Sequence, residues 1–130
     1  MYTTNEIKDI IAKATSAATT ASQEYLDTNL GGKDNYPCGF AWMNIYGVKG
    51  NTKLGRAMKQ AGIQQDYTKA FQIYNPGGLS VQNVDVKEAG AQAAAKVFES
   101  PLPSTIIVLS LSTLIFLAVP RYASVAFSNL

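Results

Sequence analysis

The hydrophobic residues near the start of the chain recur at the spacing of an α-helix. The recurring positions are Ile7, Ile10, Ile11, Ala14, Ala18, Ala21 and Tyr25. At about 100° per residue they form one stripe, and the opposite side is Ser, Thr, Lys and Asp. Thr3 and Glu6 stand in the relation of a capping box, and Gly31-Gly32 supplies a helix end. We therefore predict an amphipathic helix that begins after Thr3 and ends before Gly31.

The next hydrophobic run, 38–46, has no helical period and is rich in aromatic residues. In a strand one face carries Cys38, Phe40 and Trp42, and the other carries Ala41, Met43 and Ile45. Aromatic residues favour strands, and two largely apolar faces are typical of a strand inside a sheet. We predict a central strand here.

A second helix is predicted from about Asn51, a good N-cap, to Ala61, where Gly62 ends it. Its inner face consists of Leu54, Ala57, Met58 and Ala61. A third helix is predicted to begin at Asp85, with Glu88 as its capping partner. Its narrow inner stripe consists of Val86, Gly90, Ala93, Ala94 and Val97.

Two further strands are predicted at 69–74 and 79–84. The four residues Asn75-Pro76-Gly77-Gly78 between them carry strong turn chemistry and indicate a hairpin. The element order is then α-β-α-β-β-α. Because a hairpin excludes an all-parallel sheet, we expect an α+β fold, with three helices on one face of a small, largely antiparallel sheet.

The charged residues divide the chain into two regions. Residues 1–99 hold ten of the eleven basic residues and all nine acidic ones, whereas Arg121 is the only charge after Ser100. The prolines Pro101 and Pro103 mark the junction. We therefore predict an α+β body over 1–99 and an apolar C-terminal segment over 100–130.

The apolar segment allows two structures. As a helix, 105–119 spans about 22 Å, which is short for a bilayer core of about 30 Å. A helix over 102–122 comes closer to that thickness. In this alternative the chain is a membrane-associated protein. As strands, the same Ile, Val, Thr and Phe residues add to the sheet of the body. An uncovered apolar segment of this kind must be buried in lipid, in the core or in a partner. We favour the helix, because uniform apolarity fits lipid better than the half-exposed edge of a sheet.

Composition excludes several kinds of chemistry. The chain has no histidine, which excludes Ser-His-Asp and Cys-His catalysis and His-ligated zinc. Its single cysteine, Cys38, excludes an internal disulfide. A net charge of +2 does not indicate a nucleic-acid partner. We expect no catalytic triad, no metal and no cofactor.

The glycine-containing loop 47–53 is the sharpest local motif. It lies between a strand and a helix, where backbone amides can bind an anion, although it lacks the Walker spacing. The candidate anion or partner contacts are Lys49, Gly50, Lys53, Arg56 and Lys59. Alternatively, the glycines only turn the chain, and the basic residues form the exposed side of a surface helix.

Aromatic side chains are the second candidate feature. Tyrosine and tryptophan are favoured at protein interfaces. Trp42, Tyr46 and Tyr74 are the candidate aromatic interface. Packing within the sheet is the alternative explanation for the same residues.

Three segments carry a resemblance to a known group of proteins. They are the run YPCGFAWMNIYGVKGNTKLGRAMKQAG, the later YNPGG turn and the DVKEAGAQAAAKVFES stretch. In this order they resemble small uncharacterised proteins of tailed bacteriophages, marine cyanophages among them, over most of 1–99. The segment 101–130 resembles nothing in that group.

The resemblance implies a phage protein acting in the cytoplasm of an infected bacterium, and it transfers no catalytic residue. We expect a non-enzymatic accessory or interaction protein with a host or phage protein partner. Membrane association through 102–122 is one alternative. A small histidine-independent enzyme or anion-binding protein that uses the 47–53 loop is the other.

Overall fold

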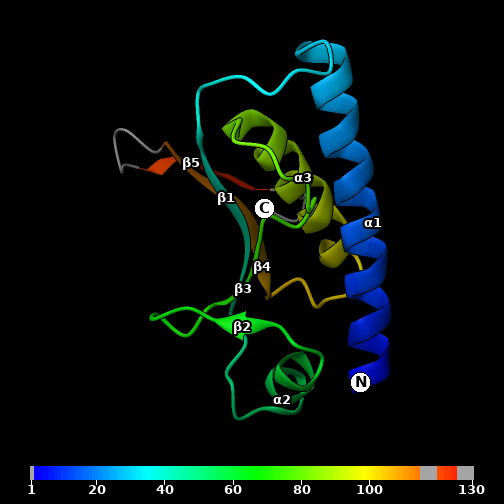
Figure 1. Ribbon diagram of the computed structural model, residues 1–130. Helices are drawn as coiled ribbons and strands as arrows, with labels where there is room; N and C mark the ends of the chain where they lie inside the picture. The colour runs from blue at the N-terminus through cyan, green and yellow to red at the C-terminus, as the bar shows by residue number, and fades with distance from the viewer. Residues whose placement is uncertain (1, 115–119, 126–130) are drawn as a thin grey trace.

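The computed structural model describes residues 2–114 and 120–125 and has an α+β fold, as predicted (Figure 1). The helices are α1 (Thr4–Asn29), α2 (Lys53–Gln60) and α3 (Val84–Glu99). The strands are β1 (Gly39–Tyr46), β2 (Gln64–Gln65), β3 (Phe71–Tyr74), β4 (Ile107–Leu114) and β5 (Pro120–Val125). Helix α3 packs on the sheet, and α1 packs on α3, so both long helices lie on one side.

The strands form one antiparallel sheet in the order β2-β3-β1-β4-β5. Strand β1 is the middle strand, which confirms the prediction of a central strand. In the register, Trp42 stands opposite Tyr74 of β3 on one side and Leu111 of β4 on the other. Residues of one face can therefore be followed across three strands.

The predicted hairpin is wrong in its position. Residues 79–84 form no strand, and β3 pairs instead with β2 through the loop 66–70. The Asp66 carboxylate organises this loop, because Oδ1 accepts hydrogen bonds from Thr68 N, Thr68 Oγ1 and Ala70 N at 2.8, 2.6 and 3.1 Å. The hydrogen bond from the Thr68 hydroxyl is the main reason that the pKa of Asp66 lies below its ordinary value.

The Asn-Pro-Gly-Gly segment leads from the sheet to α3. Asn75 N donates to Ala41 O at 2.9 Å, and the chain then passes between the two long helices. A Cβ atom on Gly77 would lie 2.4 Å from Ser22 Oγ of α1, and one on Gly90 of α3 would lie equally close. The two glycines are therefore required by the close approach of α1, α3 and this segment.

The first helix begins as predicted. Thr3 Oγ1 accepts from Glu6 N at 3.1 Å and Glu6 Oε1 accepts from Thr3 N at 3.3 Å, which completes the capping box. Helix α2 is capped by Thr52 rather than Asn51, since Thr52 Oγ1 accepts from Gly55 N at 3.1 Å.

The predicted cap of the third helix is wrong. Asn83 is the N-cap of α3, because its Oδ1 accepts from Val86 N at 3.0 Å. Glu88 lies inside the helix and faces the sheet, where its side chain is buried and accepts a hydrogen bond from Ser112 Oγ. Glu88 therefore belongs to the interior of the molecule and not to the helix start.

The apolar segment joins the sheet where the structure describes it. Strand β4 pairs with β1 along its whole length, from Ile107 opposite Tyr46 to Leu114 opposite Gly39. The predicted apolar helix is therefore wrong over 107–114, and the strand alternative is confirmed there. The predicted helix also covered 115–119, which lie outside the described residues. Over 2–114 and 120–125, no helix combines the length and apolarity needed to cross a membrane.

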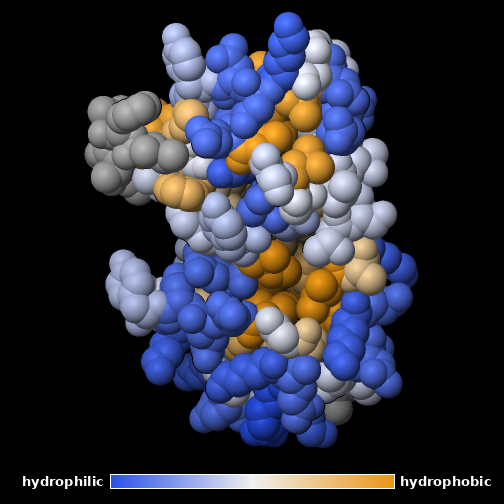
Figure 2. Space-filling view, viewed as in Figure 1, coloured by the Kyte–Doolittle hydropathy of each residue, from blue (hydrophilic) through white to orange (hydrophobic). Residues whose placement is uncertain are grey.

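The core lies between the sheet and the helices, and its largest fully buried side chains include Phe71, Phe98, Ile7, Met43 and Ile45. Seen from the side drawn in Figure 1, hydrophobic residues also come to the surface between α1 and the β2–β3 hairpin (Figure 2). Partly buried side chains that pack against the core include Ile10 and Ile11 of α1 and Ile73 of β3.

Candidate functional site

Strand β4 has its polar and apolar residues the opposite way round from an ordinary surface strand. On the side toward α3, Ser110 and Ser112 are buried together with Val108. On the other side, Ile107 is 38% exposed, and Leu109 and Leu111 are half-buried. A strand with one solvated face normally turns its polar residues outward. Here the hydroxyls face the helices and the leucines face out.

The buried hydroxyls have a structural reason on the helix side. Ser112 Oγ donates to Glu88 Oε2 at 2.5 Å, so a carboxylate of α3 is bound between the helix and the sheet. Gln92 Nε2 donates to the other carboxylate oxygen at 3.3 Å. Ser110 Oγ, by contrast, has no hydrogen-bond partner in the described part of the chain. The side of the sheet beneath α3 is called the inner face below. It thus contains a row of buried polar side chains, Ser110, Ser112 and Glu88, called the polar seam below.

The opposite side of the sheet, called the outer face below, carries an aromatic cluster. The rings of Phe40, Trp42 and Tyr74 lie with centroids 5.6–6.2 Å apart in tilted arrangements. Phe40 is 39% exposed and Tyr74 is 48% exposed. Partial burial raises the pKa of the Tyr74 phenol. Such pairs stabilise one another by about 0.5–1.5 kcal/mol beyond the area they bury.

The outer face carries no charged residue across β1, β3 and β4. By register and alternation its residues are Phe40, Trp42, Asn44, Tyr46, Gln72, Tyr74, Ile107, Leu109, Leu111 and Thr113. Asn44 is buried among them. Its Nδ2 donates to Tyr46 Oη at 3.1 Å, while its Oδ1 has no partner among the described residues. No helix of the described residues covers this face (Figure 1).

One cation reaches the margin of the outer face from the helix side. Lys87 of α3 is buried, its Nζ donates to Gly39 O at 2.8 Å, and the same atom lies 5.1 Å from the centre of the Phe40 ring. Burial lowers the pKa of Lys87, and the nearby Asp34 and Cys38 oppose that shift. Lys87 thus stabilises the position of Phe40 at the end of β1.

The aromatic interface predicted from the sequence is brought together in part. Trp42 and Tyr74 touch, and Phe40 joins them. Tyr46 lies further along β1, where its hydroxyl accepts from Asn44. The outward residues of β4, Leu109 and Leu111, were missed. The alternation of leucine and serine in the sequence of this strand could have identified them.

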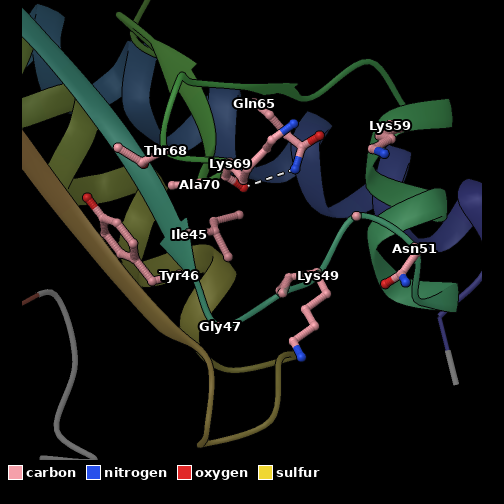
Figure 3. Close-up of a pocket in the computed structure, with 12 residues that line it drawn as sticks. Ile45, Tyr46, Gly47, Lys49, Asn51, Lys59, Gln65, Thr68, Lys69 and Ala70 are labelled. Carbon is pink, nitrogen blue, oxygen red and sulfur yellow. Dashed lines mark hydrogen bonds between the residues drawn. The ribbon is translucent and has the colours of Figure 1, made fainter.

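The predicted basic residues separate onto two sides of α2. Lys49, Gly50 and Lys59 line a pocket of about 490 Å³, shown in Figure 3, together with the hairpin residues Gln65 and Lys69. Lys53 and Arg56 instead line a groove beside Tyr2 and Gln60. Arg56 Nη1 donates to Asn51 O at 2.5 Å and so supports the start of α2.

The remaining chemistry is sparse in the part of the chain that the structure describes. No group of three His, Cys, Asp or Glu residues there is arranged to hold a metal ion. Cys38 is half-buried, and its Sγ lies 3.4 Å from Gln82 Oε1. The contact between Cys38 and Gln82 is not a catalytic arrangement.

Comparison of the chain with protein-family models, with curated proteins and with solved structures found no match. The resemblance to small phage proteins therefore stays a prediction.

Proposed function

We propose that this protein is a non-enzymatic phage accessory protein that binds a protein partner with the outer face of its sheet, in the cytoplasm of an infected bacterium. The partner contributes an apolar, weakly charged surface. The phage setting follows from the sequence resemblance, and the binding role follows from the outer face.

The reversed pattern of β4 is the observation that carries the proposal. A strand that buries serines and turns out Ile107, Leu109 and Leu111 leaves apolar area in contact with water. Each exposed apolar Å² that a partner covers contributes about 25 cal/mol. A contiguous apolar surface on a small protein is typical of an interaction site.

The composition of the outer face favours a protein over other partners. Aromatic residues are enriched and charged residues are depleted at the centre of protein interfaces. Nucleic acids and anionic lipid surfaces are bound by cations, and the outward residues of β1, β3 and β4 include none. Trp42 and Tyr74 have the character of the residues that dominate binding energy in such interfaces.

The test is affinity capture from a lysate of an infected bacterium, with the full chain as bait. Wild type should retain a specific partner, and Trp42→Ala and Tyr74→Ala should each weaken its retention roughly tenfold or more. The control is Tyr67→Ala, because Tyr67 is 95% exposed in the β2–β3 loop and is not one of the outward residues of β1, β3 and β4. It should bind like wild type.

Two results would contradict the proposal. One is equal loss of the partner in Tyr67→Ala and Trp42→Ala. The other is retention of the partner by a folded double variant, Trp42→Ala with Leu111→Ser. Thermal melting of each variant establishes that it is folded before binding is compared. Light scattering of the chain alone measures self-association, and a stable dimer held by the same residues would assign the outer face to a second copy instead.

A further inference from the structure

The pocket beside α2 is separate from the aromatic cluster and carries a different chemistry. It lies where β1 ends, and its lining comes from Ile45–Gly47, the following loop, the end of α2 and the β2–β3 hairpin (Figure 3). Its volume of about 490 Å³ is within the usual range for small-ligand sites, about 300–1,000 Å³.

Three segments of the chain contribute a lysine to the lining of the pocket. Lys49 comes from the loop, Lys59 from α2 and Lys69 from the hairpin, and no carboxylate is among the described residues that line the pocket. None of the three lysines forms an ion pair with a carboxylate within the described residues. A concave site lined by one sign of charge concentrates ligands of the opposite sign.

The end of the Lys59 side chain lies close to the loop. A Cβ atom on Gly50 would lie 2.7 Å from Lys59 Nζ and 3.3 Å from Gln65 Nε2, so both side chains approach the backbone of Gly50. Gln65 Nε2 donates to Lys69 O at 3.0 Å, which ties the hairpin to the same point. In Figure 3, the side chain of Lys49 extends away from Lys59 and Gln65. Lys59, Lys69 and Gln65 are therefore the main polar groups of the site.

The rest of the lining is partly apolar and partly polar. Val48 and Ala70, which are 9% and 6% exposed, form a small apolar wall, and Asn51 and Thr68 add polar groups. A free inorganic anion would leave this apolar wall in contact with water. A ligand that joins an anionic group to an apolar or aromatic part fills both halves of the pocket.

We propose that this pocket binds a small phosphorylated organic molecule of the size of a nucleoside monophosphate. Its phosphate lies among Lys59, Lys69 and Gln65, and its organic part lies on Val48 and Ala70. The site borders the outer face at Tyr46, which also lines the pocket, but Lys59, Lys69 and Gln65 are not residues of that face, so the site stands without the partner-binding role.

The test is titration calorimetry of the full chain with adenosine monophosphate, adenosine and inorganic phosphate at low ionic strength. Adenosine monophosphate should bind about tenfold more tightly than either of the others, since only it engages both halves. Added salt should weaken its binding and leave that of adenosine unchanged.

Lys59→Gln and Lys69→Asn should each weaken binding of adenosine monophosphate roughly tenfold, as expected for loss of one charged hydrogen bond. Lys69 has a φ of 72°, a conformation that asparagine adopts more readily than lysine, so the variant keeps the hairpin. Lys8→Gln, an exposed lysine of α1, is the matched control and should bind like wild type.

Three results would overturn the proposal. If adenosine monophosphate binds no better than adenosine, or not at all, the pocket has no phosphate site. If inorganic phosphate binds as tightly as adenosine monophosphate, the apolar wall does not contribute to binding. Equal weakening by Lys8→Gln and Lys59→Gln would show that the net charge, not the pocket, attracts the anion.

Discussion

The two faces of the sheet differ in a way that their neighbours explain. The inner face lies beneath α3 and accepts serines, because Ser112 donates to the buried Glu88 carboxylate. The outer face has no helix over it in the described part of the chain, yet it presents leucines and four aromatic rings. Hydrophobicity alone therefore does not identify the core of this protein. The helix contacts do, and the proposed partner would cover the apolar residues of the outer face.

The sharpest test of the difference compares two isoleucines on opposite faces. Ile45 is 0% exposed on the inner face, and Ile107 is 38% exposed at the neighbouring position on the outer face. Ile45→Ala should cost about 2–5 kcal/mol of unfolding free energy, because it leaves a cavity in the core. Ile107→Ala should cost less than about 1.5 kcal/mol, since much of its side chain is already in water.

Denaturant titration of both variants measures these costs. Similar losses of unfolding free energy would mean that the outer face is packed as tightly as the inner face, and the comparison would fail.

A second pair of variants tests the polar seam of the inner face. Ser112→Ala removes the hydroxyl that donates to Glu88 and should cost about 1–3 kcal/mol. Ser110 is equally buried, but its hydroxyl has no partner among the described residues. Ser110→Ala should therefore be neutral or stabilise by up to about 1 kcal/mol. Chemical unfolding of the two variants should rank them in this order, and the reverse ranking would contradict the hydrogen bonding described.

A smaller effect concerns Lys87, which links the two faces through Gly39 and Phe40. Its pKa in the folded protein lies below the ordinary value of 10.5, because burial disfavours the charged form. Between its pKa in the folded protein and 10.5, Lys87 binds more protons in the unfolded chain than in the folded one. The free energy of unfolding therefore rises with pH over this range. Above pH 10.5 Lys87 is neutral in both states, and the cost of burying its charged form is absent. Lys87→Met should flatten that rise in melting experiments at alkaline pH. A variant with the wild-type pH profile would exclude Lys87 as its source.

Local signals were enough to predict much of the inner side of the molecule. The capping box of Thr3 and Glu6 and the two apolar faces around Met43 are formed by neighbouring residues, and both predictions are confirmed. The hairpin was misplaced because Pro76 and Gly77 carry turn chemistry that fits any reversal of the chain. The Asp66 side chain, which organises the true hairpin, was not recognised as a turn signal.

The outer face and the pocket depend on long-range pairing, which a single sequence does not reveal. The alternation of Leu109, Ser110, Leu111 and Ser112 has the period of a strand, but its low polarity favoured a lipid-facing helix. Which of these residues face outward follows only from the register of β4 with β1. Likewise, Lys69 joins Lys59 at one pocket because the hairpin folds back beside α2.

Fluorescence of Trp42, the single tryptophan of the chain, tests the central claim that the outer face is open for a partner. In the isolated folded chain Trp42 is half-buried, so acrylamide should quench it in part, and addition of the captured partner should reduce that quenching. The Tyr67→Ala variant should give the same quenching and the same protection. A Trp42 that is shielded from acrylamide before any partner is added, or that stays equally accessible in the complex, would contradict the account.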